Sequence, residues 1–185
     1  MIKSYSGITG DIFSEEQLPK GKTLGSGTAI AYVFHWGDDH APRALSRLLN
    51  ENVIVKVADK SFETMDGLKY GQGSILIPLG SVNTDQAKVE KIISEINSVD
   101  GIDVYLLNTG DNRSSDLGSS YFSVITKPKI AVLTDDGVNA INAGQIWHLL
   151  DTKYKIPFTM LPLKTFKQGN INRYNVIVMP DGNYQ

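Results

Sequence analysis

The sequence predicts an α/β protein built from βαβ units with parallel strands. The first observation is a set of unbroken apolar runs, such as residues 130–133, which are typical of strands buried on both faces. The second is that a polar corner with an Asp pair follows two of these runs. The third is that amphipathic stretches, with apolar residues at i, i+3 and i+4, come directly after those corners. Strand, corner, helix and strand in that order define a βαβ unit.

The first part of the chain contains two such units. Residues 1–27 are polar and rich in glycine, and they form a leading segment with at most one short element. The predicted strands are residues 29–36, 53–58, 74–79 and 103–107, and the predicted helices are residues 41–49 and 83–98. Pro42 fits the first turn of its helix, where its missing N–H is not needed. Residues 59–72 are interpreted as a loop.

The second part begins after a polar stretch, residues 108–120, which is interpreted as a crossover between the two halves. Residues 121–125 are expected to form a short edge strand. The remaining predictions are strands at 130–133, 157–161 and 175–179, a helix at 138–150, and a short helix or turn at 166–174. The sequence therefore predicts a first α/β unit over 1–125 and a second unit over 126–185.

A parallel sheet of three strands leaves apolar faces uncovered. We therefore expect that the chain is a fragment of a longer protein, or that its second unit is closed by packing against the first. The uncovered face also predicts homo-oligomers.

Composition restricts the possible partners. The 185 residues carry a net charge of −2, and no cluster of Lys and Arg indicates a nucleic-acid partner. No apolar run approaches the ~20 residues of a membrane helix, and the N-terminus shows no signal-peptide pattern. The absence of cysteine excludes disulfides, thiolate zinc sites and cysteine nucleophiles.

Two Asp pairs mark the predicted ligand site. Thr134, Asp135 and Asp136 follow the strand at 130–133, and ligands of open α/β sheets bind at the carboxyl ends of strands. Asp38 and Asp39 occupy the equivalent corner of the first unit. Two adjacent carboxylates could hold a divalent cation. The preferred interpretation is that one Asp of each pair caps the following helix, which requires no ligand.

The three histidines give only a weak metal pattern. His35, Asp38 and His148 could supply ligands to zinc. A metal hydrolase that uses these residues is therefore a third hypothesis, beside the two functions described below. In the preferred interpretation His35 ends a strand and His148 lies beside a buried Trp147. No metal site is therefore predicted. The chain has no G-x-G-x-x-G pattern, and the Ser- and Gly-rich stretch 110–120 could instead cradle an anion.

Several phrases occur together in an order that resembles one protein family. They are AIAYVFHW, APRALSRLLNENVIVKVADKSF, GSILIPLG, SSDLGSSYF, KPKIAVLTDDGV, GQIWHLLD and RYNVIVMPDGNY, spread over residues 26–185. Together they resemble the accessory region that follows the peptidase domain in large bacterial zinc carboxypeptidases of the M14 family. The resemblance implies a class I glutamine amidotransferase-like fold, which is flavodoxin-like and here truncated.

The resemblance also implies a function. The segment would be a non-catalytic accessory part of a protein that uses zinc to hydrolyse C-terminal peptide bonds. Its partner would be the upstream peptidase domain of the same chain, in a periplasmic or secreted parent, and the segment itself would need no cofactor. His35-x-x-Asp38 has Asp where the family's zinc motif has Glu, so no zinc ligand is assigned here. The alternative is a stand-alone α/β module that binds a small anion or sugar at the strand carboxyl ends.

Overall fold

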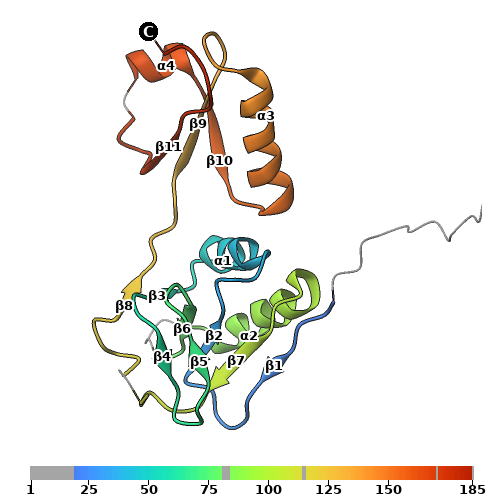
Figure 1. Cartoon of the computed structure of the whole chain (residues 1–185), viewed down its shortest axis with the longest axis vertical. Coiled ribbons are helices and arrows are strands. Elements are labelled where there is room, and N and C mark those ends of the chain that lie inside the picture. The colour runs from blue at the N-terminus through green and yellow to red at the C-terminus, as the bar shows by residue number, and fades with distance from the viewer. Residues whose placement is uncertain (1–18, 81–83, 114–115, 170, 185) are drawn as a thin grey trace, which may run out of the picture.

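The computed structural model describes residues 19–80, 84–113, 116–169 and 171–184 (Figure 1). Most of the predicted leading segment, residues 1–18, lies outside this part, as does residue 83 of the second predicted helix. Helices accompany a six-stranded sheet and a separate three-stranded sheet, which confirms the α/β class. No helix among the described residues is long and apolar enough to cross a bilayer.

The larger sheet has the strand order β1-β7-β2-β6-β3-β8. Its strands are β1 (Thr23–Leu24), β2 (Ala31–Phe34), β3 (Lys56–Ala58), β6 (Ile75–Pro78), β7 (Val104–Leu107) and β8 (Phe122–Val124). The prediction of a parallel sheet is wrong here. Strand β2 is antiparallel to β6 and β7, and β3 is antiparallel to β6 and β8, so only β1 and β7 form a parallel pair.

The predicted βαβ units nevertheless exist inside this mixed sheet. Helix α1 (Ala41–Asn50) connects β2 to β3, and helix α2 (Gln86–Glu95) precedes β7. Each unit has parallel strands, but a strand of the other unit is inserted between them, which gives the order β7-β2-β6-β3. This interleaving is the split βαβ, or ferredoxin-like, arrangement.

Both faces of the larger sheet are covered. Tyr32 and Phe34 of β2 face one cluster with the buried residues of α1 and α2, whereas Ala31 and Val33 face a second cluster. The second cluster contains Phe62, from a hairpin of β4 (Phe62–Glu63) and β5 (Lys69–Tyr70). The expected loop over residues 59–72 is therefore a hairpin. The hairpin covers the face of the sheet opposite to α1 and α2, so the strands are buried on both faces. For this reason these antiparallel strands have the same unbroken apolar runs as parallel ones.

The predicted helices form for identifiable local reasons. Helix α1 buries Ala41, Ala44 and Leu48, which share one face, and Pro42 stands in its first turn. The side chain of Asp85 caps α2 by accepting a hydrogen bond from the Lys88 amide (3.1 Å). A π-helical segment, η1 (Ile96–Asp100), extends α2.

The smaller sheet has the order β10-β9-β11, and all of its strands are parallel, as predicted. Its elements are β9 (Ile130–Thr134), α3 (Ala140–His148), η2 (Leu149–Lys153), β10 (Phe158–Pro162), α4 (Leu163–Gln168) and β11 (Val176–Val178). Strand β9 is central and buried throughout, because it lies between β10 and β11 and both α3 and α4 lie against it.

The described residues of the predicted crossover, 108–113 and 116–120, do not connect the two sheets. Arg113 pairs with Glu63 of the hairpin at 2.8 Å, and the chain then returns to form β8 at the sheet edge. The connection is instead the short segment between β8 and β9. In Figure 1 the two sheets lie one above the other with α1 between them, and Ser46 of α1 donates a hydrogen bond to the Lys155 carbonyl (2.8 Å).

Candidate functional site

A hollow of about 570 Å³ opens at the carboxyl end of β9, where the sequence predicts a ligand site. Its polar rim contains Thr134, Asp135 and Asp136. The rest of the wall comes from the start of α3, from Trp147 and from Met160 of β10. Three of the five predicted site residues therefore lie together at one cavity.

The corner after β9 has an unusual backbone. Asp135 has a φ of 70°, in the left-handed region that residues with a side chain rarely adopt. Its carbonyl accepts a hydrogen bond from the Val138 amide (2.9 Å), which closes the turn. Left-handed conformations of non-glycine residues cost on the order of 1–3 kcal/mol and are frequent at functional sites. The corner thus presents two exposed carboxylates on a fixed, strained turn.

The C-terminal segment fixes this corner from the other side. The Asn183 amide donates to the Gly137 carbonyl (2.6 Å), and the Asn139 amide donates to the Asp181 carbonyl (2.8 Å). Gly137 has a φ of 95°, and a Cβ there would lie 2.5 Å from the Asn183 carbonyl oxygen. Only glycine is therefore compatible with this position.

The expectation that an Asp caps the following helix is wrong. Asn139 caps α3, because its side-chain oxygen accepts hydrogen bonds from the Ile141 and Asn142 amides (3.0 and 3.2 Å). The corner is longer than the sequence pattern suggested, so Asp135 and Asp136 lie too far upstream to reach the first turn. Their carboxylates have no capping role that would explain them.

Sequence reasoning missed the apolar wall of the hollow. Trp147 was expected to be buried, but it is 44% exposed and lines the cavity, as does Met160, which is 52% exposed. Ala140, Ala143 and Gly144 precede Trp147 on the same helix, and their small side chains leave the space in front of the indole. The spacing of these small residues, at i, i+3 and i+4, is the signal in the sequence that points to this cavity.

Asp38 and Asp39 do not join this site. Asp39 forms an ion pair with Lys153 (2.9 Å), and the hydrogen bond from Lys153 lowers the pKa of the Asp39 carboxyl. Lys153 ends η2, so this pair lies at the opposite end of the helix from Asp136, on the order of 20 Å away at 1.5 Å per residue. Neither Asp caps α1, because the N-cap position is His40 and no side chain caps it.

The weak metal candidates are also separated into different surroundings. His35 stacks on the ring of Tyr70, with ring centroids 5.0 Å apart, whereas Asp38 lies exposed in the corner before α1 and His148 lies exposed at the end of α3. Within the described ranges, no three His, Cys, Asp or Glu side chains are grouped so that they could hold a metal ion. The third hypothesis therefore has no convergent ligand set in this part of the chain.

The chemistry of the hollow favours some ligands over others. Its two carboxylates repel an anion, so of the predicted ligands a sugar fits better. Sugar hydroxyls donate hydrogen bonds to carboxylate oxygens, and the apolar face of a pyranose packs on an indole such as Trp147.

Comparison with known proteins does not extend this assignment. No protein-family model, no curated protein and no solved structure matches the chain. The class of protein is thus defined by the fold, an α/β chain with one mixed and one parallel sheet.

Proposed function

We propose that this chain is a non-catalytic accessory segment of a zinc-carboxypeptidase-like protein, and that residues 126–185 begin a flavodoxin-like, class I glutamine amidotransferase-like unit. The observation that supports an accessory role is the apolar surface around the three-stranded sheet, and the zinc-carboxypeptidase parent is proposed from the sequence resemblance. A stable soluble unit rarely leaves so many large apolar side chains in water unless another surface covers them.

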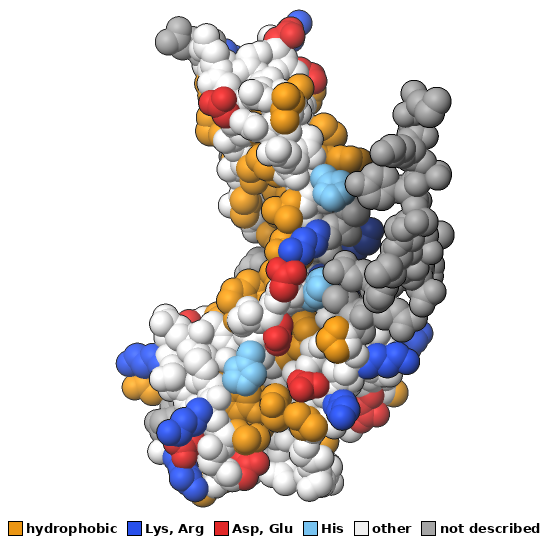
Figure 2. All heavy atoms as spheres, turned by 45° about the vertical axis from the view of Figure 1, so that its right-hand side comes forward, with side chains coloured by type: hydrophobic (Ala, Val, Ile, Leu, Met, Phe, Trp, Pro, Cys, Tyr) orange, Lys and Arg blue, Asp and Glu red, His pale blue; other side chains and the backbone are white. Residues whose placement is uncertain are grey.

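The exposed side chains are numerous for a unit of this size. The large hydrophobic residues exposed in this unit are Ile141, Trp147, Leu149, Met160, Val176 and Met179. Ile141 alone is 73% exposed. Figure 2 shows hydrophobic side chains at the surface of the part that carries α3 and the small sheet. The larger unit does not cover them, because these side chains remain exposed with the whole described chain present.

The strand order supports the flavodoxin-like assignment. In chain order the strands are β9, β10 and β11, and in space they lie as β10-β9-β11. Flavodoxin-like sheets begin with this second-first-third order and continue with further parallel strands beside the third. Strand β11 is an edge with an exposed position at Val176, as expected of a strand that a further strand would cover.

The proposed partner is the upstream peptidase domain of the same polypeptide, in a periplasmic or secreted parent. Zinc bound in that domain would activate water for hydrolysis of the C-terminal peptide bond. This segment would contribute apolar contact surface, and no residue of it would touch the reacting atoms.

Immunoblotting of the source cells with an antibody raised against this chain tests the proposal. We expect a polypeptide much larger than 20.3 kDa, which co-purifies with carboxypeptidase activity that a chelator abolishes. A native polypeptide of 20.3 kDa without that activity would overturn it. Stoichiometric zinc and peptide hydrolysis in the isolated 185-residue chain would also overturn it and would instead favour the metal-hydrolase hypothesis.

A second candidate function is small-ligand binding in the hollow at the carboxyl end of β9. The exposed carboxylates of Asp135 and Asp136 favour it, because Asn139 rather than either Asp caps α3, and because Asp135 adopts a left-handed backbone conformation. The ligand class that fits is a sugar. Titration with neutral monosaccharides, followed by Trp147 fluorescence, should show saturation in the parent chain and loss in Asp135→Asn with Asp136→Asn. Asp151→Asn, an exposed site on η2, is the matched control and should bind normally. Equal responses in all three proteins would exclude this function.

A further inference from the structure

A second hollow, of about 440 Å³, lies between α1 and α2 and is basic. Its charged lining consists of Arg43, Arg47, Lys88, Lys91 and Lys155, with Glu51 and Glu95. The lining carries five basic and two acidic groups, and with the Asp100 carboxylate that contacts both arginines an excess of two positive charges remains, on a chain whose net charge is −2. A concave basic surface concentrates anions locally even when the whole protein is weakly acidic.

A buried carboxylate, that of Asp100, holds the two arginines in place. Arg43 Nε donates to the Asp100 carboxylate (2.6 Å), and Arg47 donates to the same carboxylate from Nε and Nη2 (3.2 Å each). The Asp100 side chain is fully buried. Arg47 Nη1 also donates to Glu95 (3.1 Å), and since each terminal nitrogen carries a second hydrogen, N–H groups remain on both. The guanidinium groups are thus oriented before any ligand arrives.

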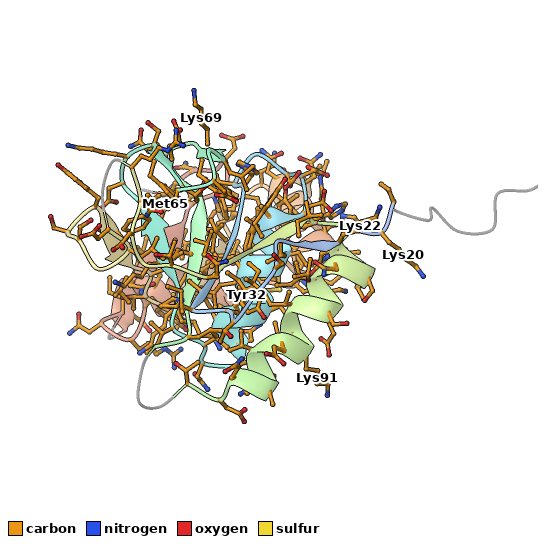
Figure 3. All side chains as sticks on the ribbon, turned by 90° about the horizontal axis from the view of Figure 1, so that it is seen from below. Lys20, Lys22, Tyr32, Met65, Lys69 and Lys91 are labelled. Atoms are coloured by element: carbon orange, nitrogen blue, oxygen red, sulfur yellow. The ribbon has the colours of Figure 1, made fainter. Side chains whose placement is uncertain are left out.

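The two lysines that complete the hollow are not committed elsewhere. Among the described residues, neither the Lys91 nor the Lys155 side chain has a hydrogen bond or ion pair, whereas the Lys88 side chain pairs with Glu51 (3.0 Å). Figure 3 shows Lys91 projecting from α2 on the side of the molecule away from Lys69. These two ammonium groups are therefore available to an incoming anion.

Lys155 reaches the hollow through a strained backbone. Its φ is 53°, in the left-handed region, and its carbonyl accepts a hydrogen bond from the buried Ser46 hydroxyl (2.8 Å). Asn50, which also lines the hollow, donates to the Ser46 hydroxyl oxygen (3.3 Å). A turn of the smaller unit is thus fixed against α1 so that its lysine lines a cavity formed by the larger unit.

We propose that this hollow binds a phosphate group, either as inorganic phosphate or as a phosphate monoester. Oriented guanidinium groups and free ammonium groups are the donors that recognise phosphate oxygens. The bound phosphate would also connect the two units, because Lys155 and the other basic residues come from different sheets. This proposal is independent of the accessory role and of the sugar site.

Calorimetric titration of the 185-residue chain with inorganic phosphate at low ionic strength tests the proposal. We expect saturable binding of one phosphate per chain. Lys91→Gln with Lys155→Gln should weaken it at least about tenfold, because two charge-assisted hydrogen bonds to the phosphate are lost. The matched control, Lys22→Gln with Lys69→Gln, changes two lysines outside the lining of the hollow and should bind as the parent chain does.

A further variant separates binding from folding. Lys155→Gly removes the ammonium group and also relieves the left-handed strain, so it should bind more weakly while its melting temperature stays the same or rises. Glycerol phosphate in place of phosphate distinguishes an ester ligand from the free ion. Absence of saturation, equal weakening in the control, or saturable binding of citrate without binding of either phosphate would each overturn the proposal.

Discussion

Tyr70 lies in an aromatic cluster behind the larger sheet, where it stacks on Phe62 and His35 (centroids 5.0 Å apart in each case). It is 2% exposed, and its hydroxyl has no hydrogen-bond partner in the described part of the chain. Burial raises the pKa of this phenol well above its ordinary value, and the nearby Tyr105 and Asp66 raise it further. A buried hydroxyl without a partner is a local cost to stability.

We predict that Tyr70→Phe is neutral or stabilising, by up to about 1–3 kcal/mol, because it removes the unpaired hydroxyl. The unfolded phenol ionises at about pH 10 and the folded one only above that. Below this pH the shifted pKa has no effect, and above it ionisation favours the unfolded chain, so the free energy of unfolding falls as the pH rises. Urea unfolding between pH 8 and 11 should therefore show a shallower alkaline loss in the variant. Tyr121→Phe, at an exposed ring, is the control. Destabilisation of the Tyr70 variant would contradict this account.

Asp100 provides a second prediction at the scale of a single residue. Its buried carboxylate neutralises Arg43 and Arg47, so Asp100→Ala leaves both guanidinium groups without their partner. We expect a loss of about 2–4 kcal/mol in the free energy of unfolding, below the upper range for buried pairs because both arginines are partly exposed. Chemical denaturation measures this loss. Asp151→Ala, at an exposed position, should change stability by less than about 0.5 kcal/mol. Similar values for the two variants would show that the pairing is unimportant.

At the scale of single elements, two residues compete for the N-cap of α3, namely Asn139 and an Asp of the preceding pair. The structure assigns the cap to Asn139, whereas the sequence pattern favoured an Asp. We predict that Asn139→Ala lowers the free energy of unfolding by about 1 kcal/mol, as is typical for the loss of an N-cap, and that Asp136→Ala has little effect. Thermal denaturation of the two variants decides between the interpretations. A larger effect at Asp136 would restore the original one.

Element prediction succeeded where periodicity alone was informative. Helices α1, α2 and α3, and the strands of both sheets other than β1, lie within or close to their predicted ranges; β1 lies in the leading segment, where no strand was predicted. The β4–β5 hairpin was missed, because each of its strands has only two residues and no alternation can be recognised over that length. Of the site residues, Thr134, Asp135 and Asp136 could be placed at a strand end, but the cavity wall at Trp147 and Met160 could not, since it depends on packing between separate elements.

At the scale of the whole molecule, the exposed apolar residues predict behaviour in solution. We expect the isolated chain to self-associate as concentration rises, because association removes this surface from water. Sedimentation velocity over a range of concentrations measures the effect. Ile141→Lys with Met179→Lys should shift the chain toward monomer, whereas Val99→Lys, an exposed site in the larger unit, should not. A parent chain that stays monomeric at high concentration would count against an uncovered interface.

The α/β class, the order of the longer helices and strands and the parallel arrangement of the second sheet could all be predicted from the amino-acid sequence. These follow from local periodicity and from the right-handed return of a βαβ connection. Two features are visible only in the folded chain: β6 lies between β2 and β3, and Asp39 pairs with Lys153, away from the cavity that Asp136 lines. The physical reason is that apolar runs show that a strand is buried but not which strand lies beside it, because that choice depends on contacts between residues far apart in the chain.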